Sequence, residues 1–168
     1  MIYLNDVPHH NLINALIHLT YDRFHFCKWI ANEKRISSSE ICNVEVEMLN
    51  LNRINEKAIL IGASSSEVTK VFETLMAISR SVQTRWIEQW GGNSPRLKRK
   101  CLISMRKQIK EIDSAILLKL NSCHLLNVDI LSESELFIDY ICRIDQMTTV
   151  DAITVLNAYH KFIHQDLE

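Results

Sequence analysis

The chain has 168 residues, of which 47% are hydrophobic and 23% are charged, and its net charge at neutral pH is −1. This length is sufficient for one domain with a sizeable hydrophobic core, and we predict a single domain over residues 1–168. The balanced charge argues against nucleic acid or a membrane surface as a partner, and no stretch has the roughly 20 apolar residues of a membrane span.

Glycine and proline are scarce, and their positions predict an all-α fold. The chain has three glycines and two prolines, and neither residue type occurs after Pro95. We expect a bundle of about six helices, in which three long helices over residues 1–92 form a core and a ligand pocket, and residues 93–168 form C-terminal helices. The predicted helices cover residues 9–34, 40–60, 64–90 and 97–125, a shorter segment from 132, and a last segment after Thr148.

The expected helix ends carry recognisable capping residues. Gly62 stands where a left-handed cap would end the second helix. Ser64 with Glu67, and Ser132 with Glu135, have the spacing of capping boxes. We assign no chemistry to the helices after Asn127 and expect them to cover the third helix and the mouth of the pocket.

Two cations in the first helix are expected to point the same way. Arg23 and Lys34 are eleven residues apart, and at about 100° per residue eleven steps return to within roughly 20° of the starting direction. The same face carries Leu16, Cys27 and Ile30, so both cations lie in a stripe that otherwise faces a core. Burying such cations costs several kcal/mol unless an anion meets them, which predicts either a bound anion or an internal carboxylate.

The second and third helices add polar residues to apolar stripes. Glu47 lies among aliphatic residues of the second helix, and Ser79 and Gln83 are one turn apart in the apolar stripe of the third. If the three stripes face one another, these groups converge with the two cations in the bundle core, which is a typical ligand site. The alternative is that each is a rim group or half of an internal salt bridge, for example between Glu47 and Lys34.

These residues and their spacing resemble the AroQ-type chorismate mutases, and the chain is similar to the longer, usually exported subclass of that family. The resemblance is carried by Asp22-Arg23, Ile30-Ala31-Asn32-Glu33-Lys34, Asn43-Val44-Glu45-Val46-Glu47, Val71-Phe72, Ser79 with Gln83, and Ile112-Asp113. It implies an all-α isomerase of the shikimate pathway, which leads to aromatic amino acids, and a periplasmic or secreted location.

The resemblance also implies the chemistry and the roles of individual residues. Chorismate, a small dicarboxylate, rearranges to prephenate in a pericyclic step without nucleophile, metal or cofactor, so catalysis rests on positioning and electrostatics. The implied catalytic residues are Arg23 on a substrate carboxylate, and Lys34 and Gln83 as donors to the ether oxygen. The implied substrate-binding residues are Glu47 at the ring hydroxyl, Ser79 at a carboxylate, Asn50 and Arg106.

Two arginines that the family pattern would place in the site are absent. Their positions hold Val46 and Ile109, and the candidates to replace them are Arg106, Lys110 and Arg53. Loss of a bidentate arginine on a buried carboxylate costs about 2 to 5 kcal/mol, which predicts weakened activity. Two alternatives therefore stand beside the mutase: a non-catalytic relative that binds a ligand or partner, and an isochorismate pyruvate lyase.

Other features of the sequence favour structural roles. Five cysteines without a C-x-x-C pair predict mostly buried thiols, with one bridge, such as Cys123 to Cys142, left open for an exported chain. His160 and His164 are one turn apart and are expected on a solvated face rather than at a metal. The basic run at residues 96–100 is expected to be a solvated helix start.

Expectations for location and assembly come from the start of the chain and from its first helix. The first eight residues have no basic leader pattern, so no export signal is expected within the chain, and a cytoplasmic location is the alternative. The early turns before Arg23 offer no arginine or lysine for a shared site, so we expect an intrachain site and leave a homodimer open. Trp86 and Trp90 are expected to pack against the C-terminal helices rather than to form a partner-binding patch.

Overall fold

The computed structural model describes residues 6–165, with side chains from residue 8, so the expectation of a missing leader falls largely outside the described residues. Within this range the chain forms seven α-helices, one short 3-10 helix and no strand, which confirms the all-α prediction. The helices are α1 (Asp6–His25), α2 (Cys27–Ile36), α3 (Val44–Leu60), α4 (Ser65–Trp90), α5 (Leu102–Leu125), η1 (Ile130–Glu133, the 3-10 helix), α6 (Ser134–Ile141) and α7 (Thr149–Ile163). No described helix has the length and apolar character needed to cross a membrane.

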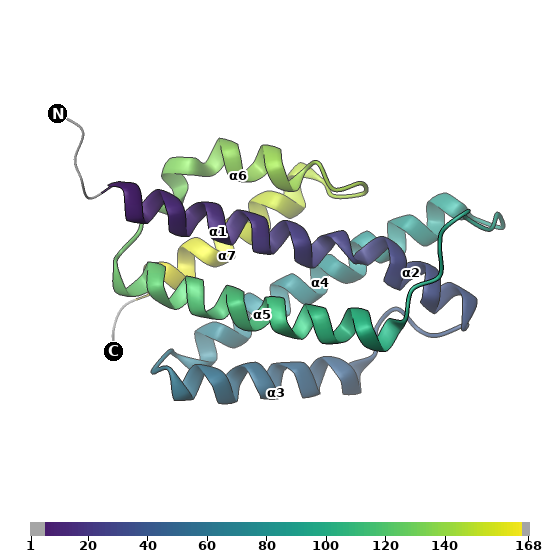
Figure 1. Cartoon of the computed structure of the whole chain (residues 1–168), viewed down its shortest axis with the longest axis horizontal. Coiled ribbons are helices and arrows are strands. Elements are labelled where there is room, and N and C mark those ends of the chain that lie inside the picture. The colour runs from purple at the N-terminus through teal and green to yellow at the C-terminus, as the bar shows by residue number, and fades with distance from the viewer. Residues whose placement is uncertain (1–5, 166–168) are drawn as a thin grey trace.

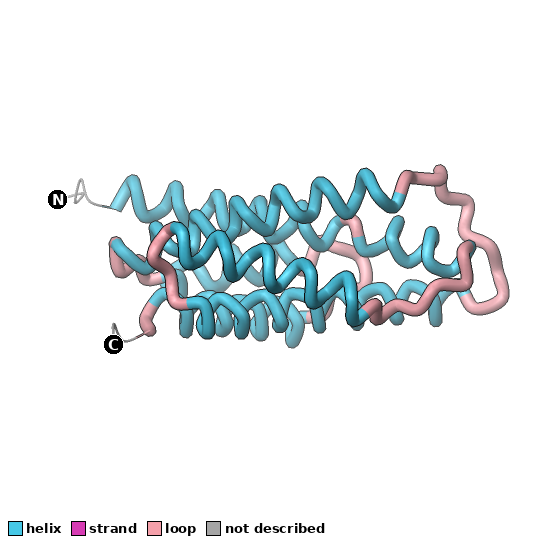
Figure 2. The backbone as a smooth tube through the Cα atoms, turned by 90° about the horizontal axis from the view of Figure 1, so that it is seen from below, coloured by secondary structure: helices cyan, strands magenta, loops and turns pink. Residues whose placement is uncertain are grey.

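α4 is the central element of the bundle. It contacts α2, α3 and α7, while α1 packs along α5. In Figure 1, α3 lies along one edge of the molecule and α6 along the opposite edge, where it packs on α1 and α7. Figure 2 shows that the long helices run side by side along the long axis. Every helix contributes residues to one buried apolar core.

The first predicted helix is in fact two helices, α1 and α2, which meet at Phe26. The backbone of Phe26 stays in the right-handed helical region, with φ −71° and ψ −19°, and its carbonyl accepts the Ile30 N–H at 3.0 Å. Because the helical hydrogen bonding continues across the junction, the side chains keep their angular order along the chain. Arg23 on α1 and Lys34 on α2 therefore remain on one face, and both are buried.

α3 begins at Val44 rather than at Glu40, because Asn43 provides its cap. The Asn43 side chain accepts the backbone N–H of Val46 at 3.1 Å, and residues 37–43 form a loop. The end of α3 is confirmed, since Gly62 follows it in the left-handed region at φ 73°.

The two predicted capping boxes are wrong. At the start of α4 the Ser64 side chain makes no capping bond, and Glu67 pairs with Lys70 on its own helix. Before α6, Ser132 lies inside η1 and donates to the carbonyl of Asp129 at 2.7 Å. Short hydroxyl side chains readily bond to a nearby backbone or side-chain group, and here those local partners replaced the expected ones.

α5 begins at Leu102, five residues after the predicted start, because the basic run before it is tied to α2. Arg99 donates from Nε and Nη2 to the Glu33 carboxylate, each at 2.8 Å, and the Lys100 ammonium lies 3.9 Å from the centroid of the Trp29 ring. The hydrogen bonds from Arg99 lower the pKa of Glu33 despite its burial. The basic side chains of the run are exposed as expected, but the run precedes the helix instead of starting it.

α7 begins after Thr148 as predicted, and Asp151 of its capping box also ties it to α4. Thr148 accepts the N–H of Asp151 at 3.1 Å, and the Asp151 carboxylate accepts the N–H of Thr148 at 3.0 Å. Arg85 of α4 donates to that carboxylate at 2.6 Å. Burial raises the pKa of Asp151, but the hydrogen bonds from Arg85 and Thr148 outweigh burial and leave the pKa below its ordinary value.

Of the helices after Asn127, α7 packs against α4, but none of their residues lines the candidate pocket, so the expected cover over its mouth is absent. Tyr159 of α7 is fully buried, and its hydroxyl lies 2.8 Å from that of Thr20 on α1. Trp86 and Trp90 stack on each other within the same core, so they form no exposed patch.

The cysteines are less buried than predicted, and all five are free. Cys27 and Cys123 are buried, whereas Cys42 and Cys101 are exposed. Cys142 is half-buried and forms no bridge with Cys123, so the suggested disulfide is absent.

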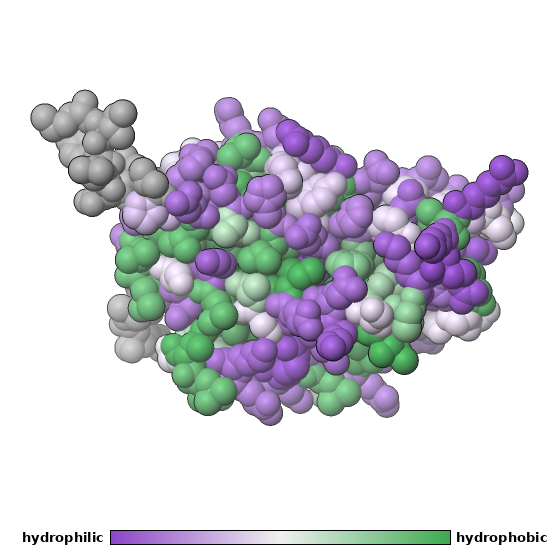
Figure 3. All heavy atoms as spheres, in the orientation of Figure 1, coloured by the Kyte–Doolittle hydropathy of each residue, from purple (hydrophilic) through white to green (hydrophobic). Residues whose placement is uncertain are grey.

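Apolar side chains reach the surface at one end of the bundle. Leu60, the last residue of α3, is 85% exposed, and Leu125, the last residue of α5, is 72% exposed. Figure 3 shows apolar residues gathered at the end where these helices finish in Figure 1. The candidate site uses the opposite, N-terminal halves of α3 and α5.

Thr148→Ala is expected to lower the free energy of unfolding by about 1 kcal/mol, because it removes the cap of α7. Ser64→Ala is the matched control, since Ser64 holds the N-cap position of α4 without a capping bond, and its effect should stay below about 0.5 kcal/mol. Urea denaturation followed by circular dichroism measures both losses. Equal losses in the two variants would contradict this assignment of the caps.

Candidate functional site

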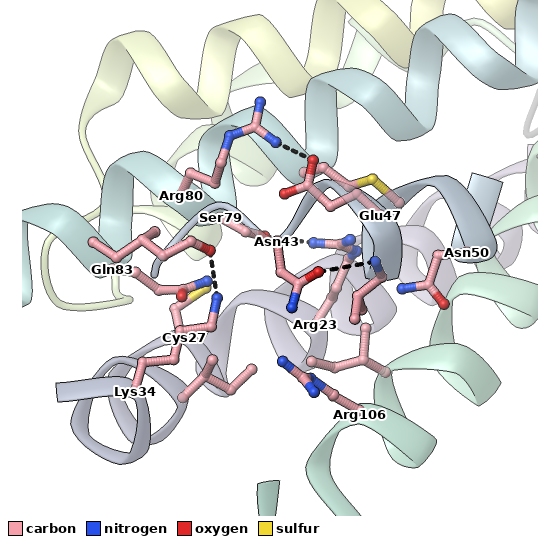
Figure 4. Close-up of a pocket in the computed structure, with 15 residues that line it drawn as sticks. Arg23, Cys27, Lys34, Asn43, Glu47, Asn50, Ser79, Arg80, Gln83 and Arg106 are labelled. Carbon is pink, nitrogen blue, oxygen red and sulfur yellow. Dashed lines mark hydrogen bonds and ion pairs between the residues drawn. The ribbon is translucent and has the colours of Figure 1, made fainter. Parts of the chain in front are cut away.

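One pocket is lined by all the site residues that the sequence predicted. They are Arg23 from α1, Lys34 from α2, Glu47 and Asn50 from α3, Ser79 and Gln83 from α4, and Arg106 from α5 (Figure 4). The empty volume of the pocket is about 660 Å³ when its open mouth is included. α5 therefore joins the N-terminal helices in forming it.

Arg23 is fixed inside the pocket by three contacts. Its Nε donates to Asp113 of α5 at 2.7 Å, and its Nη1 donates to the Ser79 hydroxyl at 2.6 Å and to the Leu75 carbonyl at 3.4 Å. Burial lowers the pKa of Arg23, but the charge and hydrogen bond of Asp113 outweigh burial and raise it. Arg23 is thus a permanent cation, and its Nη2 has no hydrogen-bond partner among residues 8–165.

Lys34 and Arg106 are neighbouring cations without a carboxylate of their own. Lys34 is buried, and its ammonium donates to the backbone carbonyl of Ile41 at 2.5 Å. Burial is the main reason that the pKa of Lys34 is lowered, and the charge of Arg106 lowers it further. Neither cation forms an ion pair with a described residue. Two like charges in a half-buried pocket favour a bound anion.

Glu47 pairs with Arg80 and not with Lys34. Nη1 of Arg80 donates to Oε2 of Glu47, which links α4 to α3 at the side of the pocket (Figure 4). The internal salt bridge between Glu47 and Lys34 that the sequence left open is therefore absent. Oε1 of Glu47 accepts no hydrogen bond from the part of the chain that the structure describes, so it is available to a ligand.

Gln83 supplies a buried amide without a partner. It is 5% exposed and lines the pocket, and its Oε1 makes no hydrogen bond with the described residues. Ser79, one turn earlier on α4, donates to the Leu75 carbonyl at 2.9 Å and accepts the bond from Arg23. A buried amide left unpaired costs about 1 to 3 kcal/mol, so Gln83 marks a position where a bound ligand or water gains hydrogen bonds.

The pocket has an excess of two positive charges. Four cations line it: Arg23, Lys34, Arg80 and Arg106. Two of them, Arg23 and Arg80, are each paired with one acid, and the other two have no acid within residues 8–165. Because a desolvated cation is stabilised by an opposite charge, this balance suits a small molecule with two negative charges.

Arg80 is the main site residue that sequence reasoning missed. It lies beside Ser79 in the sequence, and only its spacing of three residues from Gln83 could have indicated that it faces the pocket. Cys27, placed in the core stripe, also lines the pocket. Burial raises the pKa of its thiol to about 11, although the charge of Arg23 opposes this shift, so Cys27 is a neutral wall residue at physiological pH.

The two positions without the expected arginines also lie in the pocket wall, as Val46 and Ile109. Of the candidate replacements, Arg106 lines the pocket. Arg53 instead donates to the backbone carbonyl of Lys110 on α5 at 3.2 Å, and neither Arg53 nor Lys110 lines the pocket. Arg106 is therefore the replacement whose position fits.

The histidine pair near the C-terminus is not part of a metal cluster. No group of three or more histidine, cysteine or acidic side chains that could hold a metal occurs among the described residues. The rings of His160 and His164 lie 4.6 Å apart, and His164 contacts the Asn127 side chain at 3.0 Å.

Comparison with solved structures shows that the chain has the all-α fold of the chorismate mutases. The secreted chorismate mutase from Yersinia pestis matches with a TM-score of 0.77 and 18% identity, over 86% of this chain and 94% of that chain. The chorismate mutase from Burkholderia thailandensis matches with a TM-score of 0.74 and 17% identity, over 90% and 98% of the two chains. The enzyme from Burkholderia phymatum matches with a TM-score of 0.75 and 15% identity, over 92% and 97%.

The similarity is one of three-dimensional structure. No family model matches the sequence, and no curated protein matches it either.

Asp113→Ala is expected to lower the free energy of unfolding by about 3 to 5 kcal/mol, because it leaves the Arg23 guanidinium buried without its acid. Glu67→Ala breaks the pair with Lys70 at the helix surface and serves as the control, with an expected loss below about 1 kcal/mol. Both losses are measured by urea denaturation. A loss for Asp113→Ala no larger than that of the control would show that the buried pair does not support the fold.

Proposed function

We propose that this chain is a chorismate mutase, which rearranges chorismate to prephenate. The observation that carries the proposal is a set of three groups in one pocket: the cations Lys34 and Arg106, which have no acid of their own, and the buried amide of Gln83, which has no hydrogen-bond partner among the described residues. Chorismate has two carboxylates and an ether oxygen, and these match the charge and the donors of that set. The fold shared with three chorismate mutases supports the same proposal.

The reaction can be balanced with the substrate alone. Chorismate carries one carboxylate on its ring and a second on an enolpyruvyl group that an ether oxygen joins to the ring. The ether C–O bond breaks as a C–C bond forms between the ring and the methylene end of the enolpyruvyl group, and six electrons move in a cycle. No proton or electron enters or leaves. The protein accelerates this step by holding the compact conformer and by stabilising the negative charge that develops on the ether oxygen.

The two carboxylates are assigned to the two arginines that can reach them with free donors. Arg23 offers Nη2, because its other nitrogens are engaged by Asp113 and Ser79, and the Ser79 hydroxyl assists at the same carboxylate. Arg106 on the α5 wall binds the second carboxylate in place of the arginine absent at position 109. Both carboxylates thereby meet a cation that is already held in the pocket.

The ether oxygen is assigned to Lys34 and Gln83. The amide nitrogen of Gln83 and the ammonium of Lys34 donate to it, and Lys34 exchanges its bond to the Ile41 carbonyl for this contact. Oε1 of Glu47 accepts the hydrogen bond of the ring hydroxyl, and Asn50 lies one turn further along the same wall. Each polar group of the substrate then has a partner of complementary character.

A second candidate function is binding of such a dianion without turnover. The observation that favours it is the apolar character of Val46 and Ile109 in the pocket wall, where the family pattern has arginines. With fewer cations on its carboxylates, a bound dianion is held less firmly in the compact conformer that reacts, which slows the chemical step.

Location and assembly are extensions of the same proposal. One structural neighbour is described as secreted, and we propose export for this chain by that similarity. Arg23 and Arg106 come from the same chain, so one protomer supplies both carboxylate contacts.

Purified protein is expected to consume chorismate, which is followed by the loss of its ultraviolet absorbance, with isochorismate as the second substrate. Lys34→Ala should lower kcat/KM at least about 100-fold, because it removes a donor to the ether oxygen. Lys28→Ala, on the same helix but outside the pocket lining, should stay within about threefold of the wild type. Turnover that survives Lys34→Ala would reject the site. If the protein turns over neither substrate and does not bind a bicyclic transition-state mimic, the proposal of an enzyme is rejected. Release of pyruvate from isochorismate would favour the lyase.

The pH profile should be flat near neutrality and fall on the alkaline side. Gln83 donates at any pH because an amide does not titrate, so kcat/KM should change little between about pH 6 and 8. Lys34 donates only while protonated, and burial together with Arg106 lowers its pKa, so the alkaline fall should begin below the ordinary lysine value of 10.5.

Gln83→Glu is the matched variant for this profile, because a glutamate donates only when protonated and should therefore shift activity to acid pH. A steep fall of the wild-type rate between pH 6 and 7 would contradict the role of Gln83.

A further inference from the structure

We propose that Arg80 is a positioning residue that holds Glu47 away from the free cations and thereby makes the pocket selective for a substrate with a ring hydroxyl. The inference rests on the proposed function, since Glu47 is the group that meets the hydroxyl. Neither the resemblance to the mutases nor the expected roles of the site residues include Arg80.

The geometry of the pair separates the two oxygens of Glu47. Nη1 of Arg80 donates to Oε2, and Figure 4 shows the Arg80 guanidinium beside Glu47 and apart from Arg23, Lys34 and Arg106. The exposed fractions of the Arg80 and Glu47 side chains are 33% and 25%, so solvent screens the pair only in part. Oε1 has no partner among the described residues and is left for the ligand.

Without Arg80, Glu47 would have two other cations to turn to. Lys34 and Arg106 line the same pocket without acids of their own. Lys34 is close enough to Glu47 that the charge of Glu47 acts to raise the pKa of Lys34. A flexible glutamate that paired with Lys34 would neutralise the ammonium that is needed as a donor to the ether oxygen. It would also withdraw the acceptor for the hydroxyl. Arg80 prevents both losses because it provides a competing partner on the far side.

A hydrogen-bond acceptor in a fixed position selects substrates by the position of their ring hydroxyl. In chorismate the hydroxyl is on a ring carbon next to the ether carbon, on the side away from the carbon that bears the carboxylate. In isochorismate the hydroxyl is on the ring carbon between the carbon that bears the carboxylate and the ether carbon. An ionised carboxylate can only accept hydrogen bonds, so a methyl ether in place of the hydroxyl leaves Oε1 unpaired. Sites built around a substrate hydroxyl reject analogues that lack it by large factors, up to about 10⁴ to 10⁵.

The test compares kcat/KM for chorismate with kcat/KM for its ring O-methyl ether. We expect the wild type to prefer chorismate by at least about 100-fold. Arg80→Gln should reduce this preference at least about tenfold, and Arg80→Lys should restore part of it, because lysine keeps the charge but not the fork. Glu47→Ala should abolish the preference, and adding Arg80→Gln to Glu47→Ala should have no further effect on it, because Arg80 acts through Glu47.

Arg85→Gln is the matched control. Arg85 lies on α4, as Arg80 does, but outside the pocket lining, and the substitution breaks its ion pair with Asp151 of α7. It should leave the preference within about twofold of the wild type, and urea midpoints of all variants separate loss of folding from loss of selectivity. The inference is overturned if Arg80→Gln, still folded, keeps the wild-type preference while Glu47→Ala loses it. It is also overturned if the two substitutions have independent effects. A wild type that neither converts chorismate nor binds the bicyclic mimic rejects the proposed function itself, before any Arg80 variant is compared.

Discussion

Uncompensated positive charge in a largely buried pocket is the constraint on which this structure depends. Lys34 is buried beside Arg106, and neither has an acid of its own in the described chain. Removing such charges from water costs several kcal/mol, so without a ligand they must be stabilised by polar groups of the protein or by remaining water. The Ile41 carbonyl solvates the ammonium of Lys34, and Arg106 stays half-buried in reach of water. A bound dianion would replace the Ile41 carbonyl at Lys34 and the water at Arg106.

Two ion pairs keep that charge available. Asp113 engages Nε of Arg23 and Glu47 engages Arg80, so both acids of the site are occupied away from Lys34. The first pair also joins α1 to α5, which are already packed along each other, and the second joins α3 to α4. These two ion pairs thus link helices of the bundle and also set the charge of the pocket.

The helical class and the convergence of the polar residues could be read from the sequence because both follow from periodicity within single helices. The eleven-residue spacing of Arg23 and Lys34 survived the junction at Phe26, since a change of helix axis does not reset the angular order of side chains. The late start of α5 could not be predicted, because it depends on Arg99 reaching Glu33, 66 positions earlier in the chain. The role of Arg80 could not be predicted for the same reason, because its partner Glu47 is 33 positions earlier in the chain.

The most direct test of the charge balance is calorimetric titration with a bicyclic dicarboxylate that mimics the transition state, and with each of its two monomethyl esters. Each ester removes one negative charge and keeps the shape of the molecule. We expect each ester to bind at least about 30-fold more weakly than the dicarboxylate, because one cation of the pocket is then left unpaired. An ester that binds as tightly as the dicarboxylate would show that the pocket does not require two negative charges.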